Sequence, residues 1–98
     1  MKNVTVIYGK FEWNRAKELE NIKNHGCDFR TAIEAFRDPK GVLSHDEKHS
    51  EKESRFFWMG KIGQKIMTVR FTRRKTRVRI IGAGFWRKGK KFYEKENE

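Results

Sequence analysis

The chain has 98 residues, of which 24 are Lys or Arg and 13 are Asp or Glu, so its formal net charge at pH 7 is +11. With 36% hydrophobic and 38% charged residues, we expect one domain (residues 1–98) with a modest core to which eight Phe and three Trp contribute strongly. The single cysteine, Cys27, excludes an internal disulfide and a cysteine-based zinc site. No apolar stretch approaches the length of a membrane span and the N-terminus lacks a signal-peptide core, so the expected location is the cytoplasm.

The N-terminal half of the sequence is predicted to contain a short strand followed by two closely joined helices. Residues 4–8 are mainly β-branched and aromatic, and residues 11–13 alternate as a continuation or a second strand. Asn14 is a plausible N-cap for a first helix that Gly26 closes, and Asp28 caps a second helix that Asp38 and Pro39 end. Apolar residues at helical spacing are expected to bury these helices: Ala16, Leu19 and Ile22 in the first, and Phe29, Ala32, Ile33 and Phe36 in the second.

The C-terminal half is predicted to form antiparallel strands followed by a helix. Residues 40–52 are mostly polar and are expected to form a loop, in which residues 42–43 could form a short strand. Strand-like segments follow at 55–61, 65–72 and 77–83. Turns are expected at residues 60–63 and around residues 74–75, and residues 86–98 are expected to be helical, with Gly89 weakening the helix interior. The predicted class is therefore α+β: an N-terminal helix pair packed on a three- to four-stranded antiparallel sheet, with a C-terminal helix.

A strongly basic hairpin is the most informative feature of the chain. Six of the ten residues from Arg70 to Arg79 are cationic, yet they fall within segments that alternate as strands do. Guanidinium groups held at fixed spacing on a sheet suit phosphate, and the net charge favours an anionic partner. Alternation places Arg70, Arg77 and Arg79 on one polar face, where they suit RNA backbone or an acidic protein segment equally.

Several short fragments occur in a characteristic order along the chain: Phe11-Glu12-Trp13-Asn14, Lys23-Asn24-His25-Gly26, Asp38-Pro39, Asp46, His49-Ser50, Glu53, Arg55, Arg79-Ile80-Ile81 and Tyr93-Glu94. Together, over residues 11–94, they resemble the BrnT family, small ribonuclease toxins of type II toxin–antitoxin systems. The resemblance implies a RelE-like α+β fold and RNA cleavage without metal or cofactor, which inhibits translation. It also implies a neutralising partner, a dimeric DNA-binding antitoxin of the BrnA type, and a toxin homodimer within a heterotetramer.

The resemblance also implies roles for individual residues. Catalytic roles fall on Lys23, His25, Glu53, Arg55 and Arg73. RNA contacts fall on His49, Arg70, Arg77, Arg79, Arg87 and Lys88.

Two positions depart from the family pattern. Asn14 replaces the usual Asp, and Gly84 stands where a family arginine associated with activity would fall. Arg87 and Lys88 are the candidates to reach the same space. If neither does, the alternative is a catalytically degenerate module that binds RNA or antitoxin.

Each candidate residue also has an ordinary structural role. His25 suits a helix C-terminus, and Lys23, His49 and Arg73 suit solvent-exposed positions. Glu53 and Arg55 suit a surface ion pair. Trp13 and Trp58 suit either base stacking or the core. The three histidines lack ligand spacing on one element, so no metal site is expected, and no helix-turn-helix pattern supports a DNA-binding protein.

Overall fold

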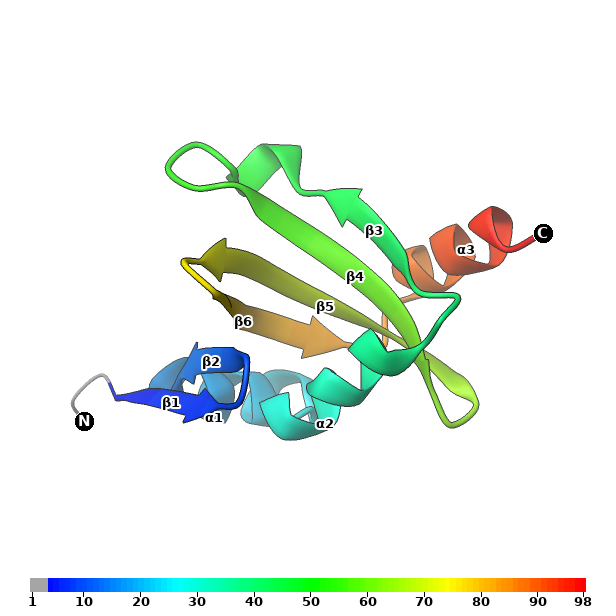
Figure 1. Ribbon diagram of the computed structural model, residues 1–98. Helices are drawn as coiled ribbons and strands as arrows, with labels where there is room; N and C mark the ends of the chain where they lie inside the picture. The colour runs from blue at the N-terminus through cyan, green and yellow to red at the C-terminus, as the bar shows by residue number, and fades with distance from the viewer. Residues whose placement is uncertain (1–3) are drawn as a thin grey trace.

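The computed structural model describes residues 4–98, and its centre is a six-stranded mixed sheet (Figure 1). The strand order is β1-β2-β6-β5-β4-β3, in which only β2 and β6 are parallel. The strands are β1 (Thr5–Tyr8), β2 (Phe11–Asn14), β3 (Val42–His45), β4 (Arg55–Ile62), β5 (Lys65–Arg74) and β6 (Arg77–Gly84). The predicted α+β class is confirmed, whereas the prediction of three or four purely antiparallel strands is wrong.

The additional strands lie at the two edges of the sheet. β1, β2 and β3 have four residues each and coincide with the short strands expected near residues 4–8, 11–13 and 42–43, but their pairing into this sheet was not predicted. The parallel pairing places Phe11 beside Val78 and Trp13 beside Ile80, so it joins segments more than 60 residues apart. Gly60 was expected in the β4–β5 turn but lies inside β4, and the turn is formed by Gly63 and Gln64.

The first helix, α1 (Arg15–His25), has the predicted ends but not the predicted buried side. The Asn14 side chain accepts a hydrogen bond from the Lys17 N–H at 3.0 Å, and Gly26 closes the helix with φ 68°. Leu19 and Ile22 are each 38% exposed, whereas Glu18 and Asn21 are buried. Local apolar spacing therefore misplaced the inner face of this helix.

The physical reason is that α1 lies along the edge of β6 instead of covering a sheet face. β2 pairs with β6 only as far as Ile80, so the next backbone groups of β6 lack a neighbouring strand. The Asn21 side-chain amide takes that place: it donates to the Ala83 carbonyl at 2.9 Å and accepts from the Ala83 N–H at 3.1 Å. A polar residue is required here because buried backbone groups need partners.

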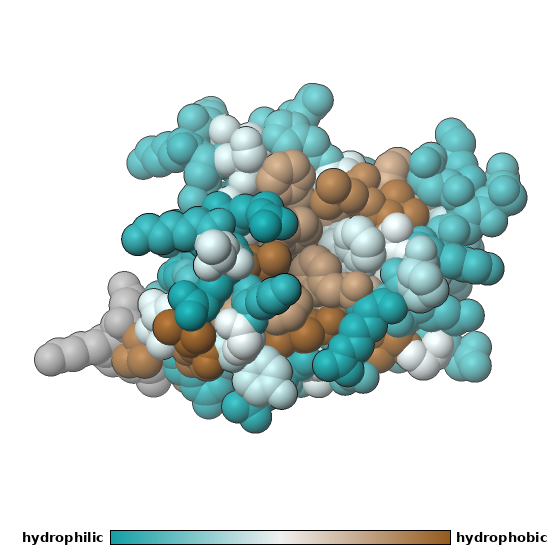
Figure 2. Space-filling view, in the orientation of Figure 1, coloured by the Kyte–Doolittle hydropathy of each residue, from teal (hydrophilic) through white to brown (hydrophobic). Residues whose placement is uncertain are grey.

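The other helices lie on opposite sides of the sheet (Figure 1). α2 (Phe29–Ile33) and the 3₁₀ helix η1 (Glu34–Arg37) cover one face, where the predicted Phe29, Ala32 and Ile33 are buried. α3 (Arg87–Glu96) covers one half of the other face. Gly89 permits this packing, because a Cβ there would lie 1.9 Å from the Thr68 hydroxyl oxygen. Figure 2 shows the α2 side, with apolar residues gathered among hydrophilic ones.

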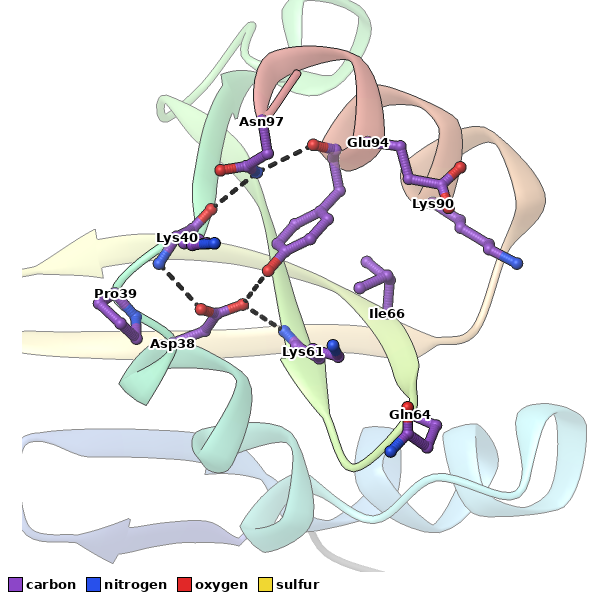
Figure 3. A pocket seen from close by; sticks show the side chains of 10 residues that line it. Asp38, Pro39, Lys40, Lys61, Gln64, Ile66, Lys90, Glu94 and Asn97 are labelled. Atoms are coloured by element: carbon purple, nitrogen blue, oxygen red, sulfur yellow. Dashed lines mark hydrogen bonds between the residues drawn. The ribbon is translucent and has the colours of Figure 1, made fainter.

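One carboxylate anchors α3 to the rest of the molecule. Asp38 accepts hydrogen bonds from the Tyr93 hydroxyl at 2.6 Å and from the Lys40 and Lys61 N–H groups at 2.8 Å each (Figure 3). Burial opposes ionisation of Asp38, but these hydrogen bonds outweigh it and lower the pKa of the carboxyl group. The same bond to Asp38, together with burial, raises the pKa of Tyr93 to about 12. A cavity of about 570 Å³ beside this anchor is lined by residues including Lys40, Lys61 and Lys90.

We expect Tyr93→Phe to lower the free energy of unfolding by about 2 kcal/mol at pH 7, because it removes a hydrogen bond to a charged acceptor. The pKa of Tyr93 is higher in the folded than in the unfolded chain, so its contribution is complete below pH 10 and is lost as the pH rises towards 12. Urea unfolding at pH 7 and pH 11.5 would measure both effects. Tyr8→Phe, at an exposed ring, is the control, and an equal loss in the two variants would contradict the prediction.

Candidate nucleic-acid interface

The half of the sheet face that α3 leaves open carries a group of charged residues, which we call the arginine face. Strand alternation and register bring them together: Arg55 lies beside Thr72, Thr72 beside Arg79, and Arg79 beside Glu12. Arg74 and Arg77 form the last pair before the β5–β6 turn. The arginine face comprises Glu12, Glu53, Arg55, Arg70, Arg74, Arg77 and Arg79.

Two carboxylates hold several of these arginines in place. Arg79 pairs with Glu12 at 2.5 Å, with only 17% of the arginine side chain exposed. Glu53 accepts hydrogen bonds from Arg74 at 3.2 and 3.3 Å and lies 3.9 Å from Arg55. The Arg74 hydrogen bond, with Arg55 and Arg79 nearby, lowers the pKa of Glu53. A carboxylate held in its charged form suits the positioning of arginines better than proton abstraction.

The Arg55 guanidinium group has one donor nitrogen without a partner. Its Nε atom is buried and has no hydrogen-bond acceptor within residues 4–98. Buried donors are almost always paired in folded proteins, so an unpaired guanidinium nitrogen requires an explanation. The Arg55 side chain as a whole is 29% exposed, so the guanidinium group can still meet an anionic ligand on the arginine face.

A buried aspartate and a histidine stand beside this group. Asp46 is 4% exposed, and its two carboxylate oxygens lie 3.1 and 3.2 Å from His49 Nδ1. One of those oxygens is also 3.5 Å from Arg70 Nε. The short helix η2 (Glu47–His49) turns the imidazole back onto the carboxylate and leaves Nε2 without a partner among the described residues.

His49 shares a pocket with two members of the arginine face. His49, Glu53 and Arg55 line one shallow pocket of about 230 Å³, together with Lys48, Glu51 and Lys52. A carboxylate at Nδ1 places the proton on that nitrogen and leaves Nε2 able to accept one. His49 and Arg55 therefore bring a proton acceptor and a guanidinium group to the same pocket. These are two of the groups that phosphodiester transfer needs.

A family model described as the BrnT ribonuclease toxin of type II toxin–antitoxin systems matches residues 13–89. The chain belongs to the BrnT family. It is thus an endoribonuclease toxin, with RNA as its substrate and a cognate antitoxin as its partner. No curated protein matches the sequence. No helix within residues 4–98 is long and apolar enough to cross a membrane.

The BrnT chain brings six of the predicted site residues into one region. Glu53, Arg55, Arg70, Arg77 and Arg79 belong to the arginine face, and His49 borders it. Arg73 lies elsewhere: it pairs with Val78 and shares the opposite side of β5 with Phe71. The remaining four, Lys23, His25, Arg87 and Lys88, lie on α1 and α3.

Three members of this region were missed from the sequence. Asp46 was matched to the family but assigned no role, although its spacing of three from His49 is a usable signal for a side-chain pair across one turn. Arg74 was expected in a turn, but β5 includes it, and the turn begins at Lys75, whose φ is 56°. Glu12 faces Arg79 only because β2 pairs with β6, which no local pattern indicates.

Burial and contacts describe the surroundings of the remaining candidate positions. Trp13 is 1% exposed, and Trp58 donates to the Ala35 carbonyl at 2.7 Å, so both belong to the core. The space beside Gly84 is not filled by Arg87 or Lys88: a Cβ on Gly84 would lie 2.7 Å from the ring of Trp86. Within residues 4–98, no three His, Cys, Asp or Glu side chains are grouped as metal ligands.

Proposed function

We propose that this BrnT toxin cleaves RNA on the arginine face by attack of a ribose 2′-oxygen on the adjacent phosphorus. The bond from phosphorus to the 5′-oxygen breaks, which leaves a 2′,3′-cyclic phosphate and a 5′-hydroxyl. The reaction needs a base for the 2′-hydroxyl proton, cations for the charge on the phosphorane, and a proton donor for the 5′-oxygen. The pocket shared by His49 and Arg55 is the observation that carries this proposal.

The roles follow from the geometry of that pocket. His49 takes the 2′-hydroxyl proton on Nε2, while Asp46 orients the imidazole and stabilises its positive form. Arg55, with its unpaired Nε, and Arg70 neutralise the phosphorane oxygens. Lys48 and Lys52 line the pocket, and either ammonium group can protonate the 5′-oxygen.

The more distant cations position the RNA backbone. Arg77 and Arg79 follow one another on the same side of β6, so they present guanidinium groups along a line. Only 17% of the Arg79 side chain is exposed, against 36% of the Arg70 side chain, so Arg70 and Arg77 are the more available phosphate ligands. The net charge of +11 attracts RNA to this surface over longer distances.

The same surface suits inhibition by the antitoxin. We infer that a BrnA-type antitoxin places an acidic segment on the arginine face and so excludes RNA. In this arrangement two toxin chains join an antitoxin dimer in a heterotetramer. The net charge of +11 and the arginines gathered on this face support this inference.

One alternative has a specific observation in its favour. Gly84 provides no guanidinium group where the family has an arginine, and Trp86 fills the adjacent space. Under this alternative the chain binds RNA or antitoxin without cleaving RNA.

Incubation of the purified protein with RNA in the presence of EDTA decides between these functions. We expect cleavage with cyclic phosphate ends, and an Arg55→Ala variant about 10²- to 10³-fold slower, because it removes a donor to developing charge. Arg73→Ala is the matched control, since Arg73 lies on the other face, and should stay within a few-fold of the wild type. A folded wild-type protein that does not cleave would support the degenerate module. Loss of cleavage with EDTA, or an equal effect of Arg73→Ala, would contradict the proposal.

A further inference from the structure

An exposed tryptophan occupies the position where a side chain at residue 84 would lie. Gly84 is in register with Thr68, and the nearest Trp86 ring atom would be only 2.7 Å from a Cβ on Gly84. The indole therefore packs directly on the backbone at the end of β6. Trp86 nevertheless remains 39% exposed, and the adjacent Phe85 is 44% exposed.

The surroundings of these two aromatic rings are cationic and aromatic. The His25 ring stands edge-on to Trp86, with 5.0 Å between ring centroids and 76° between ring planes. Lys65 places its ammonium group 5.3 Å from the centre of the Phe85 ring. Both contacts lie at one end of the sheet, but on opposite sides of it: Trp86 packs on Gly84, whereas alternation places Lys65 with Met67 on the α2 side.

The Trp86 ring, which packs on Gly84, lies on the same side of β6 as the arginine face. A bulge beside Ile81 shifts the register, so that Arg70 pairs with Gly82 and Thr68 with Gly84. Gly82 and Gly84 consequently share the side of Arg79. Gly82, which lies between Arg79 and Gly84, has no side chain. Within 4 Å, a Cβ there would meet only the Asn21 amide oxygen, at 3.6 Å. About 15 Å of β6 separates Arg79 from Gly84, on which Trp86 packs.

We propose that Trp86, supported by His25, is a stacking subsite for an unpaired base of the RNA substrate, a few nucleotides from the scissile phosphate. The inference rests on the proposed function, since the arginine face holds the phosphate. Aromatic faces bind bases of any sequence, and cations beside them attract the backbone. Arg87 and Lys88, which follow Trp86 directly in the chain, and the net charge of +11 make RNA a better occupant than a second copy of this cationic chain.

The subsite explains how this chain uses the space that a family arginine would fill. An arginine at position 84 would offer a charge to the backbone, whereas the indole offers a flat surface to a base. A base in a duplex is already stacked on both faces and paired along one edge, so it cannot reach Trp86 unless the duplex opens. The subsite therefore selects single-stranded RNA.

Binding of a 2′-O-methyl RNA oligonucleotide of about ten nucleotides tests the subsite without any cleavage. We expect Trp86→Leu, which keeps an apolar cover on Gly84, to weaken binding about 10-fold, and Trp86→Phe to retain most of the affinity. An abasic site can then be placed at each position of the oligonucleotide in turn. We expect it to weaken binding to the wild-type protein by about the same factor at one position only. In Trp86→Leu, removal of the base at that position should not weaken binding further, because that variant has no indole ring on which the base could stack.

The outcomes separate this inference from the proposed function. Abasic penalties that are equal in wild type and Trp86→Leu at every position would overturn the subsite, even if the protein cleaves RNA. A penalty that disappears in Trp86→Leu would support it, even if the wild type fails to cleave. Equal binding by Trp86→Phe and Trp86→Leu, with both variants folded by circular dichroism, would also overturn it.

Discussion

Replacing His49 with alanine is expected to lower the rate of RNA cleavage at saturating substrate by roughly 10²- to 10⁴-fold, the usual contribution of a general base. The loss should appear in kcat, because the imidazole acts in the transition state, whereas binding depends on the arginines. The buried Asp46 carboxylate at 3.1 Å from Nδ1 is the reason to expect an effect of this size from a half-exposed loop residue.

Free imidazole should restore part of the activity of His49→Ala, since the vacated space opens to solvent. A purely structural role for His49 would give no such rescue. His45→Ala is the matched control: His45 is exposed on β3, on the opposite side of the sheet, against Phe56. We expect it to stay within about threefold of the wild type, and an equal loss in both variants would remove His49 from the mechanism.

Asp46→Asn should reduce kcat by about 10-fold or more while the protein stays folded, because an amide at Nδ1 no longer specifies the tautomer or stabilises imidazolium. This result belongs to the same test, since it distinguishes a positioned histidine from a solvated one. Unchanged cleavage by Asp46→Asn would show that His49 works without its carboxylate partner.

Glu18→Ala is expected to lower the free energy of unfolding by about 3 kcal/mol or more, a large part of the stability of a domain of this size. The Glu18 carboxylate is 4% exposed and accepts hydrogen bonds from the Trp13 indole N–H at 3.0 Å and the Phe29 N–H at 2.9 Å. Arg15 adds a third bond at 2.6 Å. Removal of the carboxylate leaves two buried donors without acceptors. It also removes the hydrogen bonds that join the Glu18 side chain of α1 to Trp13 in β2 and Phe29 in α2.

Urea unfolding followed by circular dichroism measures this effect. Glu20→Ala is the control, because Glu20 lies on the same helix and is exposed. Its unfolding free energy should change by no more than about 0.5 kcal/mol. Glu18→Gln should fall between the two, since it keeps one carbonyl oxygen for one donor. Equal stabilities of Glu18→Ala and Glu20→Ala would show that the three hydrogen bonds contribute no net stability.

Much of the local structure was predictable because its causes are local. Asn14 and Gly26 marked the ends of α1 through capping and a left-handed conformation, and Asp28 caps α2 through the Thr31 N–H at 3.0 Å. Met67, Val69 and Phe71 are buried as alternation predicts. The same alternation placed Arg70, Arg77 and Arg79 on one face.

The composition of the site was less predictable because it depends on pairing between distant segments. The β2–β6 pairing brings Glu12 to Arg79, and the end of β5 decides that Arg74, and not Arg73, meets Glu53. A one-residue difference along a strand reverses the face on which a side chain lies. His25, predicted as a catalytic residue, contacts Trp86 instead of the arginine face.

By itself, the sequence determined the family, the α+β class, the helix ends and the basic hairpin, because capping, alternation and motif order are recorded in neighbouring residues. The tertiary structure alone decided which charges meet. It set Asp46 behind His49, it used Asn21 to close the open edge of β6, and the bulge beside Ile81 turned Gly84 towards the arginine face. These arrangements depend on strand register and on edge pairing, which are fixed by contacts between segments far apart in the chain.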